Sequence, residues 1–166
     1  MTVERAEPSA FDDIGEPLRS RFVARTGVLL DSYRRLLGRD LIARRGDARD
    51  DAARLYAAPF VVLAHGTQAD PLLDYANAVA LSLWEMPPER LIGMPSRQTA
   101  EPVNQEARAR FLEQTRLAGF ATGYEGVRIA ASGRRFRIEN ATLWNLADAA
   151  GHPAGQAATF NGWTFL

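Results

Sequence analysis

The chain has 166 residues, 20 basic and 20 acidic side chains, two histidines and no cysteine. This length suits a single domain, and the formal net charge of zero argues against a nucleic-acid-binding module, which normally carries a basic excess. Without cysteine or lysine, the chain has no disulfide, cysteine-ligated zinc, iron–sulfur cluster, thiol nucleophile, Schiff-base lysine or P-loop lysine.

The first 17 residues carry acids and prolines where a secretory signal peptide needs a basic start followed by an apolar run. No segment approaches the roughly 18 uninterrupted apolar residues that cross a membrane as a helix. We therefore expect a cytoplasmic protein with neither a membrane nor nucleic acid among its partners.

The first predicted element is a helix on which apolar residues recur at three- and four-residue steps. These apolar positions are Leu29, Leu30, Tyr33, Leu36, Leu37 and Leu41. A polar segment at residues 45–51 follows, in which Asp50 or Asp51 is expected to cap a short helix that ends near Tyr56. We expect residues 1–55 to form an N-terminal helical extension. It would form a homodimer through Leu30, Tyr33, Leu37 and Leu41.

Residues 56–166 are predicted to form a domain of mixed strands and helices. Two short strands, residues 59–64 and 72–76, flank a turn that contains His65. Asn77 is expected to cap the helix that follows. Proline and glycine bound a short helix at residues 87–93, and a longer helix runs over residues 103–118.

Three strands close the chain, at residues 124–130, 134–146 and 156–165. Alternation along the middle strand predicts one face made of Phe136, Ile138, Asn140, Thr142 and Trp144. The opposite face is predicted to be a charged stripe of Arg128, Arg135, Arg137 and Glu139, either exposed to solvent or a docking face for an acidic partner or for the N-terminal helix. The element order fits an α+β fold with a five-stranded antiparallel sheet and helices on one face.

Several motifs in this second part resemble known families. The segments DPLLDYAN (70–77) and PPERLIGMP (87–95), with the hairpin at Ser132-Gly133, resemble PAS domains over residues 56–163. HGTQADP (65–71), PSRQTAEP (95–102) and GRRFRIENATLWN (133–145) resemble more narrowly the MEKHLA family. This PAS-related domain occurs in small stand-alone bacterial proteins and at the end of plant class III homeodomain–leucine zipper transcription factors.

The resemblance implies a PAS-like fold for residues 56–166 and a sensory function without catalysis. PAS domains hold a small molecule or cofactor between sheet and helices, or dimerise to pass a signal. The hexapeptide that gives the MEKHLA family its name is absent, as a chain without lysine requires. The resemblance names no reaction.

The flavin-binding photosensory branch of PAS domains carries a cysteine that forms a light-driven adduct, followed by an arginine. Ser96 and Arg97 stand at these two places, so adduct chemistry is excluded, although Arg97 could pair with a phosphate. The positions that grip the flavin ring in that branch correspond to Arg128, Ile138 and Thr159 rather than to asparagine and glutamine. We therefore expect no flavin. In an alternative interpretation, Ser96 and Arg97 only stabilise a loop and a helix start.

The two histidines, His65 and His152, fall in predicted turns, where a ring nitrogen commonly holds the backbone. Because haem needs an axial ligand inside the pocket, we expect no haem, and the scarcity of metal ligands predicts no metal site. No catalytic residues are predicted, since no nucleophile motif or acid–base pair stands at a usable spacing. A small α+β enzyme that pairs His65 with Asp70 or Asp74 is one alternative.

Polar side chains on the apolar face of the last strands favour a ligand site, because buried amides and hydroxyls need partners. They would line a neutral, polar and aromatic pocket for an uncharged or zwitterionic metabolite. The predicted ligand-binding residues are Ser96, Arg97, Asn140, Thr142, Trp144, Gln156 and Thr159. Two other interpretations stay open: a satisfied polar network within the sheet, and a ligand-free domain that only pairs with itself or with a partner protein.

Overall fold

Six antiparallel strands form the sheet of the computed structural model, which describes residues 10–166. They are β1 (Val61–His65), β2 (Leu73–Ala76), β3 (Phe120–Ile129), β4 (Arg135–Ala147), β5 (Pro153–Phe160) and β6 (Gly162–Phe165). The strand order is β2-β1-β5-β4-β3, and β6 pairs with the first part of β4. The predicted α+β fold with an antiparallel sheet is confirmed, and the last predicted strand is divided at Asn161.

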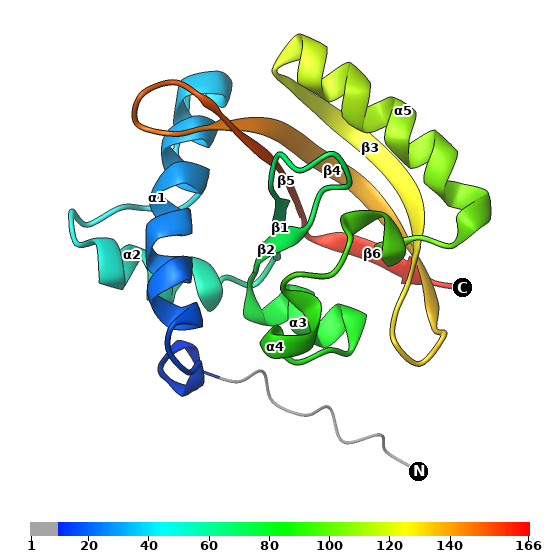
Figure 1. Cartoon of the computed structure of the whole chain (residues 1–166), viewed down its shortest axis with the longest axis horizontal. Helices are drawn as coiled ribbons and strands as arrows, with labels where there is room; N and C mark the ends of the chain where they lie inside the picture. The colour runs from blue at the N-terminus through cyan, green and yellow to red at the C-terminus, as the bar shows by residue number, and fades with distance from the viewer. Residues whose placement is uncertain (1–9) are drawn as a thin grey trace.

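One face of the sheet is covered by the helices that lie between β2 and β3 in the chain (Figure 1). These inner helices are α3 (Ala78–Trp84), α4 (Pro88–Leu91), the 3-10 helix η2 (Ser96–Thr99) and α5 (Pro102–Ala118). The α5 helix runs along β3 and ends at Gly119, whose φ of 96° suits a residue without Cβ. The inner helices and the sheet enclose the space in which a PAS-like ligand would lie.

The N-terminal helices cover the opposite face of the sheet. They are α1 (Leu18–Leu37) and α2 (Ala48–Tyr56), preceded by the 3-10 helix η1 (Phe11–Asp13). Trp144 of β4 donates its indole N–H to the carbonyl of Leu29 at 3.3 Å, and its ring centroid lies 5.0 Å from that of Tyr33. The helical extension therefore shares one hydrophobic core with the sheet. The boundary at residue 55 stays a prediction.

The ends of the two N-terminal helices differ from the prediction. The α1 helix ends at Leu37 because Gly38 adopts a left-handed φ of 74°, so Leu41 lies beyond the helix. The α2 helix begins earlier than predicted and is capped by Asp47, whereas Asp51 is buried inside its first turn. The absence of a signal peptide was predicted from the first 17 residues, and residues 1–9 of that segment lie outside the described residues.

Asn77 caps α3, as predicted, and also joins β1 and α2. Its Oδ1 accepts hydrogen bonds from the backbone N–H of Ala80 at 3.2 Å and of Val62 at 3.0 Å. Its Nδ2 donates to the carbonyls of Phe60 at 2.7 Å and Leu55 at 3.3 Å. Because the side chain is fully buried, all four bonds are shielded from water.

A β-bulge interrupts β4. In the register with β3, Gly126 pairs with Ile138 and Tyr124 pairs with Ala141. Between these two pairs β4 advances by three residues while β3 advances by two, so β4 contains one extra residue. Asn140 adopts a φ of 49° within this extra step, and its side chain is exposed. Asn140 therefore does not lie on the inner face, contrary to the prediction.

The bulge reverses the side-chain alternation for the rest of β4, because one extra residue moves every following side chain to the other face. Leu143 consequently faces the inner helices, as Phe136 and Ile138 do before the bulge. Trp144 faces α1 instead. The prediction that Thr142 and Trp144 share a face with Phe136 is therefore wrong.

Within residues 10–166, the helices include none that is both long and apolar enough to cross a membrane.

Candidate functional site

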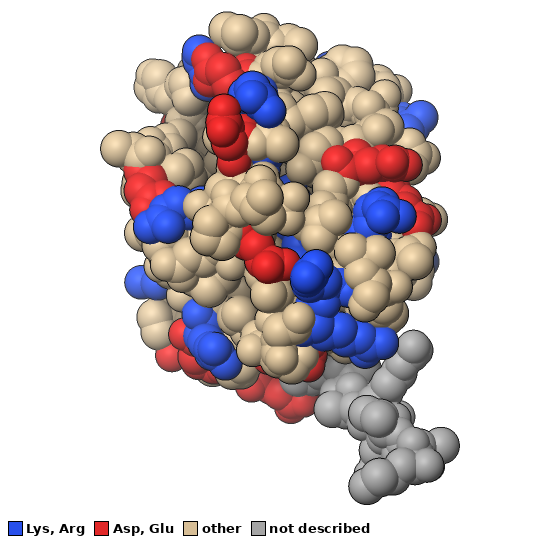
Figure 2. All heavy atoms as spheres, turned by 90° about the vertical axis from the view of Figure 1, so that its right-hand side faces the viewer, with Lys and Arg blue, Asp and Glu red and all other residues tan. Residues whose placement is uncertain are grey.

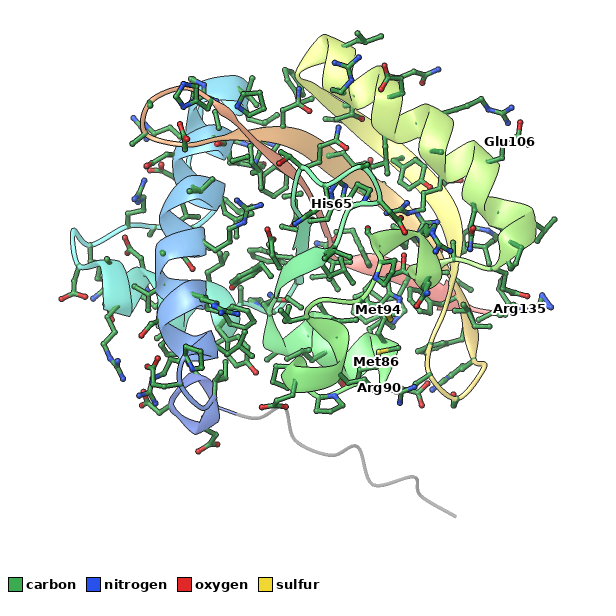
Figure 3. The ribbon with its side chains drawn as sticks, in the orientation of Figure 1. His65, Met86, Arg90, Met94, Glu106 and Arg135 are labelled. Carbon is green, nitrogen blue, oxygen red and sulfur yellow. The ribbon has the colours of Figure 1, made fainter. Side chains whose placement is uncertain are left out.

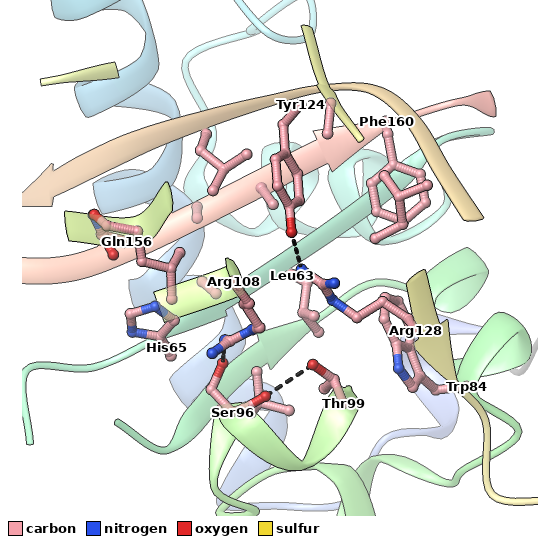
Figure 4. Close-up of a pocket in the computed structure, with 18 residues that line it drawn as sticks. Leu63, His65, Trp84, Ser96, Thr99, Arg108, Tyr124, Arg128, Gln156 and Phe160 are labelled. Atoms are coloured by element: carbon pink, nitrogen blue, oxygen red, sulfur yellow. Dashed lines mark hydrogen bonds between the residues drawn. The ribbon is translucent and has the colours of Figure 1, made fainter. Parts of the chain in front are cut away.

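A small cavity lies between the sheet and the inner helices, with a volume of about 50 Å³ (Figure 4). Its apolar wall includes Leu63, Leu73, Leu112, Ile138, Leu143, Ala158 and Phe160. Its polar wall consists of His65, Ser96, Thr99, Arg108, Tyr124, Arg128 and Gln156. Since one water molecule needs about 10–15 Å³ by the same measure, the space suits about four or five non-hydrogen atoms.

Arg128 of β3 is buried in this wall, with 7% of its surface exposed. It faces inward because its register partner on β4 is Phe136, which lies on the inner face. Its Nη1 donates to its neighbour's carbonyl, that of Val127, at 2.9 Å, and its Nη2 donates to the hydroxyl of Tyr124 at 2.8 Å. The guanidinium carbon also lies 5.5 Å from the centroid of the Tyr124 ring. These contacts hold the guanidinium but leave its charge uncompensated.

Arg108 reaches the same cavity from α5 and donates a hydrogen bond to the hydroxyl of Ser96. Thr99 donates to the Ser96 carbonyl at 2.8 Å, which fixes the η2 turn beneath the arginine. Burial and the positive charge of Arg128 lower the pKa of Arg108 to about 10, so Arg108 remains charged at neutral pH. No ion pair within residues 10–166 involves either Arg108 or Arg128.

His65 ends β1 and lies in the interior, as Figure 3 shows, with 8% of its surface exposed. Its Nδ1 lies 3.0 Å from the Gly66 carbonyl, which can only accept, so Nδ1 carries the proton and Nε2 presents a lone pair. Burial, assisted by the charges of Arg108 and Arg25, lowers the pKa of His65 and keeps the ring neutral at neutral pH.

Two polar atoms of the cavity-lining residues have no hydrogen-bond partner within the described chain. They are Nε2 of His65 and the indole N–H of Trp84, and both residues are more than nine-tenths buried. Buried polar groups are ordinarily satisfied, and leaving one unpaired costs about 1–3 kcal/mol. An acceptor and a donor are therefore available to a bound molecule.

Two of the seven predicted ligand-binding residues, Ser96 and Gln156, line the cavity. The amide nitrogen of Gln156 is already engaged, since Nε2 donates to the Leu112 carbonyl at 2.9 Å and to Oδ1 of Asn145 at 3.1 Å. Arg97 points away from the cavity and pairs with Asp70 at the surface at 3.2 Å.

The other four predicted residues lie away from the cavity. Thr142 and Thr159 face one another across β4 and β5 on the outer side of the sheet. Trp144 packs against α1 on that side, and Asn140 is exposed in the bulge. For Asn140, Thr142 and Trp144 the cause is the bulge, which moved the second part of β4 out of the predicted alternation.

Five polar residues of the cavity wall were missed, namely His65, Thr99, Arg108, Tyr124 and Arg128, and Arg108 had a signal in the sequence. Arg108 stands on the helix face of Phe111, Leu112 and Thr115, at steps of three, four and seven, so it interrupts an apolar stripe. His65 was assigned to a turn next to the strand that it ends.

Arg128 was predicted to lie in the outward charged stripe, which is wrong. The arginine faces Phe136 across the β3–β4 ladder, whereas Arg135 and Arg137 of the predicted stripe are exposed. Only the strand register separates these two environments, and the residue types do not reveal it.

The residues predicted to mediate dimerisation are mostly inside the chain. Leu30 and Tyr33 are 1% and 5% exposed and pack beneath the outer face of the sheet. Leu37 and Leu41 are partly exposed. Dimerisation stays a prediction, and Leu37 and Leu41 are the members of this set that a partner could reach.

The alternative of a histidine–aspartate pair is not supported by the contacts of either aspartate. Asp70 is held by Arg97, and Asp74 forms an ion pair with Arg25 of α1 at 2.9 Å. His65 hydrogen-bonds to neither. Residues 10–166 also contain no cluster of three or more His, Cys, Asp or Glu side chains arranged to hold a metal ion.

Acidic and basic side chains are interspersed over the face of the molecule that carries α5 and the β3–β4 hairpin (Figure 2). Several are paired, as in the contact of Arg135 with Glu101 at 3.1 Å. On this face the charges therefore neutralise one another locally, in contrast to the two unpaired arginines of the cavity.

Comparisons with known proteins agree with this geometry. The family model described as the MEKHLA domain matches residues 23–165. Among solved structures, a PAS domain of a protein from Colwellia psychrerythraea is similar with a TM-score of 0.59 and 14% identity, over 71% of this chain and 95% of that one. No curated protein matches the chain in sequence.

Two light-oxygen-voltage proteins share the fold as well. An RNA-binding light-oxygen-voltage receptor has a TM-score of 0.53 and 16% identity, over 63% of this chain and 30% of that one. A light-oxygen-voltage domain studied with a flavin analogue has a TM-score of 0.53 and 16% identity, over 69% of this chain and 82% of that one. At these identities the likeness shows the fold alone.

Proposed function

Because this chain belongs to the MEKHLA domain family, we propose that it is a non-catalytic sensory protein that binds a small molecule between its sheet and its inner helices. The observation that supports the proposal best is the polar lining of the cavity. His65 and Trp84 each present a buried atom without a partner there, next to two charged arginines. A domain built only for packing would ordinarily satisfy such groups.

Flavin and haem do not fit the residues present, and we expect neither. The cavity of about 50 Å³ is far smaller than an isoalloxazine or porphyrin ring system, and the Arg128 guanidinium lies in its wall. Ser96, at the place of the adduct-forming cysteine, is engaged by Arg108. His65 lies in the cavity rather than in a remote turn, but the space beside it is too small for a haem.

Purified protein provides the test of ligand binding. We expect native mass spectrometry to detect a bound small molecule, or a metabolite panel to raise the melting temperature, while the visible absorbance spectrum stays blank. Thermal stability that responds to no metabolite, together with a mass equal to that of the polypeptide, would refute ligand binding. A flavin or haem band would refute the expectation on cofactors.

A second candidate function, a ligand-free module that pairs with itself or a partner, is favoured by the small volume of the cavity. Light scattering tests self-pairing directly. If the chain dimerises through its N-terminal helix, Leu37→Asp and Leu41→Asp together should yield monomers. Leu30 and Tyr33 are unsuitable for this test because they are buried in the chain's own core. A wild-type monomer would contradict self-pairing.

A further inference from the structure

The two arginines of the cavity identify the class of molecule that it binds. We infer that the cavity binds a two-carbon monocarboxylate, held between Arg108 and Arg128, with a hydroxyl group on the neighbouring carbon. The inference deepens the proposed function and rests on it, because it names the ligand of the same cavity.

The first support is the balance of charge. Two guanidinium groups face one small cavity, and within residues 10–166 no carboxylate pairs with either of them. Burying a charge without a counter-charge is costly, and placing two like charges together adds to the cost. Burial and the charge of Arg128 lower the pKa of Arg108, and Tyr124 and Asp70 only partly oppose this effect. An anion bound between the two groups would remove this repulsion.

The second support is the number of free donors. A guanidinium has five N–H donors in a planar fork that fits a carboxylate. Arg128 uses one N–H on the Val127 carbonyl and one on the Tyr124 hydroxyl, and Arg108 donates to Ser96. In Figure 4 both groups lie between Tyr124 on one side and Ser96 and Thr99 on the other. Donors that remain on each arginine can therefore serve one anion between them.

The third support is the size and character of the remaining wall. The volume of about 50 Å³ accommodates a few atoms, and Leu63, Ile138 and Phe160 form its apolar side. A carboxylate with a short hydrocarbon part satisfies both the arginines and this apolar side. An inorganic oxyanion has no apolar part, and it would leave the aliphatic wall without contacts.

His65 adds a requirement on the ligand. Because its Nδ1 donates to the Gly66 carbonyl and burial keeps the ring neutral, its unpaired Nε2 is an acceptor. A hydroxyl beside the carboxylate could donate to it, as in glycolate. Acetate would leave Nε2 unpaired, and one hydrogen bond of this kind corresponds to about tenfold in affinity.

A groove on the surface adjoins the cavity and gives a path for entry. It runs between α5 and β3 and is lined by Asn104, Ala107, Phe111 and residues 123–128. Tyr124 and Arg128 line both the groove and the cavity, so their hydrogen-bonded side chains form the wall between them. Gly126 makes room for this wall, because a Cβ at that position would lie 2.5 Å from the Tyr124 hydroxyl oxygen.

Calorimetric titration of the full chain with glycolate, acetate, glycolamide and sulfate tests the inference. We expect glycolate to bind about tenfold more tightly than acetate, and glycolamide and sulfate to bind at least about a hundredfold more weakly than glycolate. Arg128→Gln should weaken glycolate binding by about a hundredfold or more. Arg110→Gln, which changes an exposed arginine of α5 paired with Glu106, is the matched control and should bind normally.

The other possible results of these titrations distinguish the carboxylate inference from the proposed function. Equal affinity for glycolate and glycolamide, or for glycolate and sulfate, would overturn the carboxylate inference. If Arg128→Gln fails to fold, the partly exposed Arg108→Gln takes its place with the same expectation. Binding of a neutral or zwitterionic metabolite, but of no carboxylate, would overturn this inference and leave the proposed function standing. A cavity that binds nothing would refute both.

Discussion

Replacing Asn77 by aspartate separates two functions of this side chain. The carboxylate keeps an acceptor for the N–H groups of Val62 and Ala80, so a role in helix capping alone predicts no change, because asparagine and aspartate cap equally well. The same change removes both N–H donors and turns an anionic oxygen toward the carbonyls of Phe60 and Leu55. Losing two buried bonds and burying a charge without a cation should cost about 3–5 kcal/mol.

That loss is large compared with the about 5–15 kcal/mol of a typical domain, so urea unfolding followed by tryptophan fluorescence will resolve it. Asn77→Ala should cost a similar amount, because it removes all four hydrogen bonds. Asp47→Asn at the exposed cap of α2 is the matched control and should cost only a few tenths of a kcal/mol. If Asn77→Asp unfolds within about 1 kcal/mol of the wild type, the donated bonds do not stabilise the fold and the reasoning is refuted.

Three further changes test other parts of the structure in the same urea assay. Gly155→Ala should lower the free energy of unfolding by about 3 kcal/mol or more, because φ is 117° and a Cβ would lie 1.9 Å from the His65 carbonyl oxygen. Gly151→Ala is the control, because Gly151 has a φ of 84° with open space around it, and it should cost only about 1–2 kcal/mol. Folding lowers the pKa of His65 below its ordinary value of 6.5, so as the pH falls this histidine binds a proton in the unfolded chain before it does so in the folded chain. The free energy of unfolding should therefore fall from about pH 7.5 to about 5.5, an effect that His65→Gln reduces and exposed His152→Gln does not. Trp144→Phe removes an indole hydrogen bond on the outer face of the sheet and should lower the free energy of unfolding by about 1–3 kcal/mol. The affinity of the cavity for its ligand should not change, and a loss of ligand binding would contradict the placement of Trp144 on the outer face.

The element order was predictable because each element has a local signal. Asn77 marks the start of α3, Gly119 marks the end of α5, and the period-two pattern marks the strands. The antiparallel sheet and the PAS-like arrangement followed from that order. The end of α1 was predicted beyond Leu37 because apolar spacing continues to Leu41, but Gly38 stops the helix first.

The cavity was less predictable because its composition depends on register and on long-range packing. Alternation predicts the inner face of β4 up to Ile138, and a single left-handed residue, Asn140, then reverses it. Arg128 is inward only because of its register partner on β4. Arginine is usually exposed, so composition assigns such a residue to the surface unless the sheet register is known.

The bulge at Asn140 also constrains how the length of this chain can change. Removing Asn140 would restore strict alternation from Ile138 onward, with Leu143 still toward the inner helices and Trp144 still toward α1. Removing a second residue from the same stretch would exchange the two faces, and Trp144 would then enter a cavity of about 50 Å³ that has no room for it. Relatives of this protein should therefore differ by at most one residue between Ile138 and Trp144, and those with the shorter strand should lack the bulge.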